Sequence, residues 1–283
     1  MAGWIVLAMV LWGIGWPALK VVTDTTVPVE TVTFLRFAIM AVSFLPVLYW
    51  RRKPLRLNRR TLRFSVAAGA LNVAFMYFAF WGVQTGSAGA GGVIITVASP
   101  ILTALLALLV FRTRVTPPQL LGLGVGLIGG MLMLEVWHAD LLHSGNVFFI
   151  GSALVWAVLT LLGQQSHTEM EPIHFNFWLA VFAVPIALVP ALPAGLGTVL
   201  DQEWQFWTGL LFLAIMGQTV ASTIYFVAAG KIGSAKAGSY MFLVPLTALA
   251  ASFLLLGERP SFWLVAGGAV STAAVYFINA RKR

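Results

Sequence analysis

Residues 77–104 read YFAFWGVQTGSAGAGGVIITVASPILTA, and residues 225–248 read YFVAAGKIGSAKAGSYMFLVPLTA. Both stretches contain, in the same order, a Tyr-Phe pair, a Gly-Ser-Ala triplet and a proline that Leu-Thr-Ala follows closely. Small gaps are needed to align them, and Gly122 parallels Gly267 further along. The chain is therefore predicted to contain two copies of one structural unit.

The composition indicates where such a unit can fold. Of 283 residues, 60% are hydrophobic, 13% aromatic and only 9% charged, whereas about a quarter of a soluble domain is charged. The mean hydropathy is +0.92, and there are no cysteines. Soluble, disordered and disulfide-rich classes are excluded. We predict an all-α integral membrane protein whose surroundings are a lipid bilayer.

Apolar stretches long enough to cross a bilayer require about 20 residues each. Ten are expected from the sequence, at 4–21, 31–50, 62–83, 87–111, 117–134, 146–163, 173–190, 206–229, 237–256 and 261–279. The short connections leave no room for a soluble domain, and no cleavable signal peptide is expected.

The basic residues predict the orientation of these spans. Fourteen of the 17 Lys and Arg residues fall on one side, in the connections 51–63 and 112–114, at Lys231 and Lys236, and in 281–283. By the positive-inside rule both termini are expected to be cytoplasmic, in a multi-pass protein of a bacterial inner membrane. The net charge of +8 is thus ascribed to topology, and no nucleic-acid partner is expected.

Each predicted copy, 1–140 and 141–283, contains five helices. Because five is odd, the second copy must be inverted in the membrane relative to the first. Inverted repeats are typical of secondary transporters that alternate access to a site between the repeats. Glycine and proline at matching points predict hinges at Gly86, Pro100, Gly233 and Pro245.

Short motifs place the chain near a known family. Leu11-Trp12-Gly13 with Lys20, Leu35-Arg36-Phe37, the Gly-Ser-Ala turns and Leu256-Gly257-Glu258-Arg259 resemble the ten-helix EamA-type branch of the drug/metabolite transporter superfamily. In the first copy Arg112-Thr113 stands in place of Gly257-Glu258. The resemblance implies an exporter, most similar to those of aromatic amino acids, with a cavity between helices one, three, four, six, eight and nine.

Polar side chains inside a bilayer are costly and usually face a cavity or a partner, so they are candidate ligands. Those of helices three, six, eight and nine are Asn72, Tyr77, Gln84, Gln164, Gln218, Ser222, Tyr225, Ser239 and Tyr240. Aromatic walls are predicted from Trp12, Trp16 and Trp156. Lys236 is the candidate partner for a substrate carboxylate, and Arg36 is assigned a structural role.

Absent groups narrow the chemistry. No Asp or Glu lies in the middle of a span, which disfavours proton-coupled export of permanent cations. His138 and His143 are expected on the opposite side from His167 and His174, so the four cannot share a zinc ion. No catalytic motif is recognisable. We expect no enzymatic activity, no metal site and no cofactor.

The sequence thus predicts a secondary transporter that exports small amino-acid-like metabolites, aromatic or otherwise neutral, by alternating access. Two alternatives within transport are a multidrug exporter and an exchanger of phosphorylated metabolites, the latter requiring at least two cavity cations. A membrane-embedded enzyme or assembly factor is the alternative from another class. The substrate, the coupling ion and the oligomeric state are left open.

Overall fold

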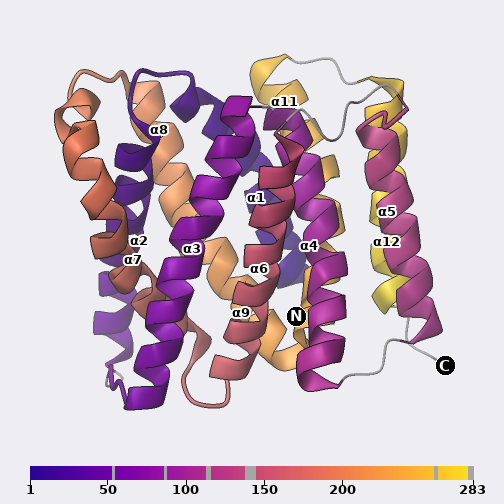
Figure 1. The fold of residues 1–283 in the computed structure, drawn as a ribbon, viewed down its shortest axis with the longest axis horizontal. Helices are drawn as coiled ribbons and strands as arrows, with labels where there is room; N and C mark the ends of the chain where they lie inside the picture. Colours follow the sequence, from indigo (N-terminus) through magenta and orange to yellow (C-terminus); the bar gives the residue numbers. More distant parts are fainter. Residues whose placement is uncertain (53–54, 86–87, 113–115, 138–144, 258–260, 280–283) are drawn as a thin grey trace.

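A computed structural model describes the chain except for residues 53–54, 86–87, 113–115, 138–144, 258–260 and 280–283. The regular secondary structure of the described residues is entirely helical (Figure 1). The elements are α1 (Ala2–Thr23), α2 (Val29–Arg51), α3 (Arg59–Thr85), α4 (Ala88–Phe111), α5 (Pro117–Met133), α6 (Asn146–Ser166), α7 (Pro172–Ala194), η1 (Leu196–Val199), α8 (Trp204–Leu211), η2 (Phe212–Ala221), α9 (Ser222–Ile232), α10 (Ser234–Ser239), η3 (Tyr240–Leu243), α11 (Val244–Leu256) and α12 (Phe262–Asn279).

The all-α membrane fold is confirmed. Within the described ranges, nine helical stretches are long and apolar enough to cross a membrane, and α5 is a shorter apolar helix. When α5 is counted as the fifth span, the eighth span consists of α8, η2 and α9 in continuous succession, and the ninth of α10, η3 and α11. Apolar side chains such as Leu109, Leu254 and Phe262 are largely exposed on the outside, as lipid-facing residues should be.

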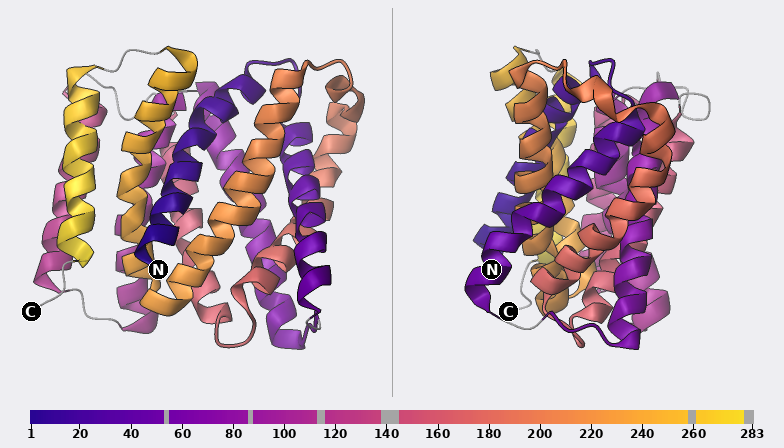
Figure 2. Two further views of the ribbon diagram at one scale, coloured as in Figure 1. Left: turned by 180° about the vertical axis from the view of Figure 1, so that it is seen from behind. Right: turned by 90° about the vertical axis from the view of Figure 1, so that its left-hand side faces the viewer.

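The helices form an elongated bundle with a distinct pair at each end. In Figure 1, α5 and α12 stand at the right and α2 and α7 at the left, while the other spans lie between them. The start of α1 and the end of α12 lie at the lower face of that view, which we call the terminal face. From behind, in Figure 2, α12 lies in front of α5.

The contacts between helices follow a regular scheme. α2 packs on α7 and α5 packs on α12. α6 packs on both α3 and α4, and in the same way α1 packs on both the eighth span and α11. The scheme stays the same when α1 is exchanged with α6, α2 with α7, α3 with the eighth span, α4 with the ninth span and α5 with α12.

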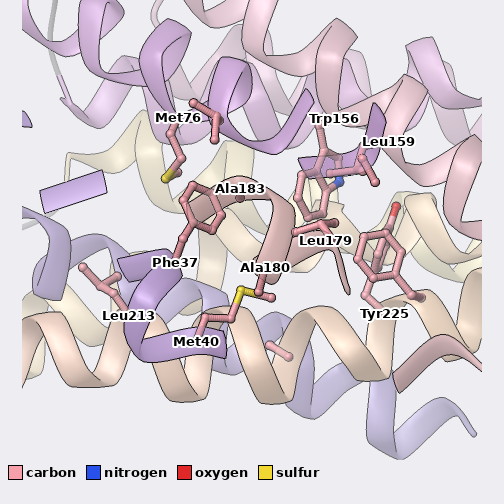
Figure 3. Packing of buried hydrophobic residues seen from close by; sticks show 14 of the residues in the cluster. Phe37, Met40, Met76, Trp156, Leu159, Leu179, Ala180, Ala183, Leu213 and Tyr225 are labelled. Carbon is pink, nitrogen blue, oxygen red and sulfur yellow. The ribbon is translucent and has the colours of Figure 1, made fainter. Parts of the chain in front are cut away.

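Small residues let these helices approach closely. A Cβ on Gly129 of α5 would lie 2.6 Å from the amide nitrogen of Ser271 and 2.7 Å from the carbonyl oxygen of Gly267, both on α12. Between α2 and α7, Figure 3 shows Ala180 and Ala183 close to the larger Phe37 and Met40. Lipid tails are as apolar as Leu, so van der Waals fit of this kind is a main source of helix association.

The backbone is irregular mainly in the second five helices. The eighth span widens to a π-helix over Phe212–Ala221, and Gly233, with φ at +87°, separates α9 from α10. A 3₁₀ turn at Tyr240–Leu243 leads into α11, where Pro245 occupies the first turn. The predicted hinge positions Gly233 and Pro245 therefore coincide with breaks in regular helix.

The first five helices contain fewer such features. Pro100 lies inside α4, which runs without a break from Ala88 to Phe111. The remaining hinge candidate, Gly86, lies outside the described residues, as do His138, His143, Glu258 and the last four residues. Whether these positions bend during transport stays a prediction.

The α5–α12 contact gives a first test. Gly129→Val should lower the free energy of unfolding by about 1–3 kcal/mol because its side chain would collide with the α12 backbone. The matched control is Gly124→Val on the same helix, where an added Cβ meets nothing within 4 Å. Thermal unfolding of detergent-purified protein measures both. Equal unfolding temperatures for the two variants would contradict the described packing.

Candidate functional site

A cavity of about 130 Å³ lies between the central helices. It is lined from α1, α2, α3, α4, α6, η2, α9, η3 and α11, so that both halves of the chain contribute. The lining residues are Leu11, Trp12, Gly15, Trp16, Leu19, Arg36, Phe75, Met76, Ala79, Ile95, Thr96, Trp156, Leu213, Gly217, Gln218, Ser222, Met241 and Val244.

Aromatic rings form much of the wall. The edge of one indole meets the face of another where Trp12 and Trp156 lie 5.2 Å apart between ring centroids. Phe75 contacts Trp156 at 5.1 Å, and Tyr225 closes the group behind them, 5.1 Å from Trp12. Figure 3 shows Trp156 and Tyr225 on neighbouring elements, with the phenol ring deep in the bundle. Such rings offer a large apolar contact area and electron-rich faces for a cation.

Polar atoms concentrate at the π-helical segment η2. The indole Nε1 of Trp12 donates to the carbonyl oxygen of Gly217 at 3.0 Å. The Ser222 hydroxyl lies 3.2 Å from that same oxygen and 3.2 Å from Oε1 of Gln218. Carbonyl, amide and hydroxyl groups therefore converge at one point on a wall whose other described residues, apart from Arg36 and Thr96, are apolar or aromatic.

A side chain of α7 supports η2 from behind. Nδ2 of Asn176 donates to the carbonyl oxygen of Gln218 at 3.1 Å and to Oγ1 of Thr223 at 2.8 Å. Asn176 is fully buried. These two bonds use its Nδ2, whereas its Oδ1 has no hydrogen-bond partner among the described residues. π-helical turns are rare and are frequent at functional sites.

The structure brings five of the predicted site residues to this cavity, namely Trp12, Trp16, Trp156, Gln218 and Ser222. Two others, Gln164 and Lys236, line a second cavity of about 140 Å³ nearer the terminal face. There the backbone nitrogen of Ser234 donates to Oε1 of Gln164 at 2.7 Å. Lys236 and the aromatic wall thus belong to different cavities.

Six predicted residues are not among those that line either cavity. Tyr225 is fully buried with its hydroxyl 3.1 Å from Oγ1 of Thr160. Ser239 donates to the carbonyl oxygen of Lys236 at 2.7 Å and accepts from Asn279. Gln84 is exposed. The other three are Asn72, Tyr77 and Tyr240.

Arg36 is the residue that sequence reasoning placed differently. The sequence analysis assigned Arg36 a structural role and left it out of the cavity candidates, whereas the structure places Arg36 on the wall of the central cavity. Its presence inside a span was the available signal, because intramembrane ionisable residues are functional candidates by default. Helix rotation, which decides whether α2 turns it inward, is not encoded in a single motif.

Comparisons with known proteins agree with this geometry. The model of the EamA-like transporter family matches residues 1–135 and again 143–280. The chain belongs to the EamA-like transporter family. Its members are transporters and not enzymes, so an enzymatic role is set aside.

Relatives within the EamA family carry varied names. A WAT1-related chloroplastic protein of Arabidopsis thaliana is 30% identical over 95% of this chain and 66% of its own length. A probable terminal-alkyne amino-acid exporter of Streptantibioticus cattleyicolor is 26% identical over 98% of this chain and 92% of its own. A riboflavin transporter of Vibrio cholerae is 25% identical over 89% of this chain and 83% of its own length.

A solved crystal structure shares the fold across 99% of this chain and 98% of its own, with a TM-score of 0.76 and 16% identity. The narrower expectation, a likeness to the aromatic amino-acid exporter YddG, is not supported, because these EamA relatives bear other names.

The bond between α1 and η2 can be tested directly. Trp12→Phe keeps an aromatic ring in the wall and removes the donor to Gly217. We expect a loss of about 0.5–1 kcal/mol in the free energy of unfolding, the usual net contribution of one such hydrogen bond. Trp4→Phe, at an exposed position of the same helix, is the control. Thermal unfolding of equal or higher stability in Trp12→Phe would argue against the bond.

Proposed function

We propose that this EamA-family protein is a secondary transporter that exports small, neutral, amino-acid-like metabolites by alternating access. One observation carries the proposal: the central cavity combines an aromatic wall with a compact polar group at Gly217, Gln218 and Ser222. An amino acid with an apolar side chain presents the same two surfaces. The name of the amino-acid exporter relative adds support.

The size of the cavity favours a small substrate. Pockets that hold drug-sized ligands enclose roughly 300–1,000 Å³, whereas this one encloses about 130 Å³. A molecule as large as riboflavin, which a relative is named for, needs a wider cavity than the one described.

The charges favour a neutral or zwitterionic substrate over a phosphorylated one. A doubly charged phosphate ester calls for two or more cations, and Arg36 is the one charged residue among the described residues that line the central cavity. Lys236 lies in the second cavity. No carboxylate belongs to the described lining, so transport driven by the substrate gradient is as compatible with the site as proton coupling.

Alternating access requires two units that can rock against each other, and we propose residues 1–140 and 141–283 as inverted repeats. The exchangeable scheme of helix contacts supports this arrangement, as does the double match of the family model. Trp12 and Trp156, at matching positions of the two proposed repeats, touch each other at the cavity. Equivalent residues of two repeats contact each other in this way when they lie near the pseudo-two-fold axis that relates the repeats.

We further propose that the terminal face is cytoplasmic in a bacterial inner membrane. Exposed arginines at this face, including Arg56 and Arg63, belong to the excess of positive charge that the cytoplasmic side of a membrane protein carries. Two ion pairs link helix ends at this face to the connection between α6 and α7, Arg60–Glu169 at 2.8 Å and Arg51–Glu171 at 3.1 Å. Exposed pairs of this kind add little stability.

Counterflow uptake into proteoliposomes tests the proposed function. Labelled tryptophan, phenylalanine, methionine and threonine are offered with and without a pH gradient, beside protein-free vesicles. We expect saturable uptake of at least one, and Gln218→Ala should raise its half-saturation concentration by about tenfold, equivalent to about 1.4 kcal/mol. The pH gradient arm reports proton coupling.

Gln84→Ala is the matched control, because it removes an exposed glutamine that does not line the cavity. It should transport as the wild type does. Failure of folded wild-type protein to take up any of the four amino acids would overturn the proposed substrate class.

A further inference from the structure

Arg36 is a buried cation that has no counter-ion among the described residues. Its side chain lies in the eighth position of α2 and is only 6% exposed. Its Nε donates to no acceptor, and it forms no ion pair within the described part of the chain. It lines the central cavity and an adjoining smaller one of about 20 Å³.

Such an arrangement is costly unless something compensates for it. Arginine stays protonated in proteins, and removing one charge from water without a partner costs several kcal/mol. The remaining described residues of both cavities are apolar, aromatic or uncharged polar. A negatively charged molecule that enters the cavity would supply the missing counter-charge.

The chemistry of that molecule follows from the guanidinium and its surroundings. The planar fork of arginine pairs with a carboxylate through two parallel hydrogen bonds. One cation suits one negative charge, and the neighbouring Trp16, Leu19 and Met76 suit an apolar substituent. A carboxylate on a small apolar or aromatic body fits better than a phosphate ester.

We propose that Arg36 binds the carboxylate of the transported substrate and so selects carboxylate-bearing molecules over their amides and amines. This inference rests on the proposed function and specifies its substrate chemistry. It replaces Lys236 as the expected carboxylate partner, because Lys236 lines the other cavity.

The test compares wild type, Arg36→Gln and Arg36→Lys in proteoliposomes, with Arg63→Gln as an exposed arginine control. Labelled phenylalanine counterflow is competed with phenylalanine, phenylalaninamide and phenethylamine. In wild type and Arg63→Gln we expect both compounds that lack the carboxylate to compete at least about tenfold more weakly. Arg36→Gln should raise the half-saturation concentration for phenylalanine by a similar factor and abolish the preference, and Arg36→Lys should keep part of it.

A purely structural role predicts a different result. Arg36→Gln would then lower the unfolding temperature yet retain the preference for the carboxylate, and this outcome overturns the inference while leaving the transporter in place. If Arg36→Gln does not fold, Arg36→Lys is the deciding variant, because lysine keeps the positive charge but lacks the planar guanidinium. A preference for the carboxylate as strong as in the wild type would then overturn the inference. Stronger competition by phenyl phosphate than by benzoate would overturn the choice of carboxylate over phosphate.

Binding to purified protein separates the two proposals if the wild type transports none of the amino acids. Thermal unfolding is then measured with benzoate, benzamide and phenyl phosphate. Stabilisation by benzoate alone that disappears in Arg36→Gln, or is reduced in Arg36→Lys, supports the carboxylate site although the proposed amino-acid substrates have failed. No stabilisation by benzoate overturns the inference as well.

Discussion

A peptide carbonyl inside a bilayer has no water to bond to, so each carbonyl that leaves the helical ladder must find a donor within the protein. In this structure three carbonyls of the π-helix η2 accept hydrogen bonds from side chains in the middle of the eighth span. Trp12 bonds Gly217, Asn176 bonds Gln218, and Thr219 bonds Ala214. The donors come from α1, α7 and η2 itself, so this one irregularity ties the first helix and the seventh to the eighth.

The same requirement explains where the cavity lies. Irregular backbone at membrane depth is tolerated where it is buried in protein or lines a cavity, and η2 meets both conditions. Its inner side supplies Gly217 and Gln218 to the cavity, while Asn176 supports the opposite side. The first five helices keep α3 and α4 unbroken. The two halves thus contribute differently, with a more regular wall from one and the polar group from the other.

Sequence reasoning was strong for the apolar spans, which composition and length decide, and for the family, which short motifs indicated. Trp12, Trp156 and Gln218 reached the cavity because an aromatic or amide residue in mid-span has few stable alternatives. Asn72 and Tyr225 satisfy the same criterion and yet do not line it, since helix rotation depends on packing across the bundle. The π-helix was not predictable, because nothing in FLAIMGQTVA, residues 212–221, departs from ordinary helical composition. Arg36 could be recognised in the sequence as a charged residue within a span, but whether its side chain faces the cavity depends on the same helix rotation.

The central claim is that substrate binds between the aromatic wall and η2. Crystals grown with an iodinated phenylalanine and measured for anomalous scattering test it most directly. The account predicts an iodine peak in the cavity enclosed by Trp12, Trp156 and Gln218, and its loss when excess unlabelled phenylalanine is added. A competable peak in the second cavity beside Lys236, with the central one empty, would contradict it.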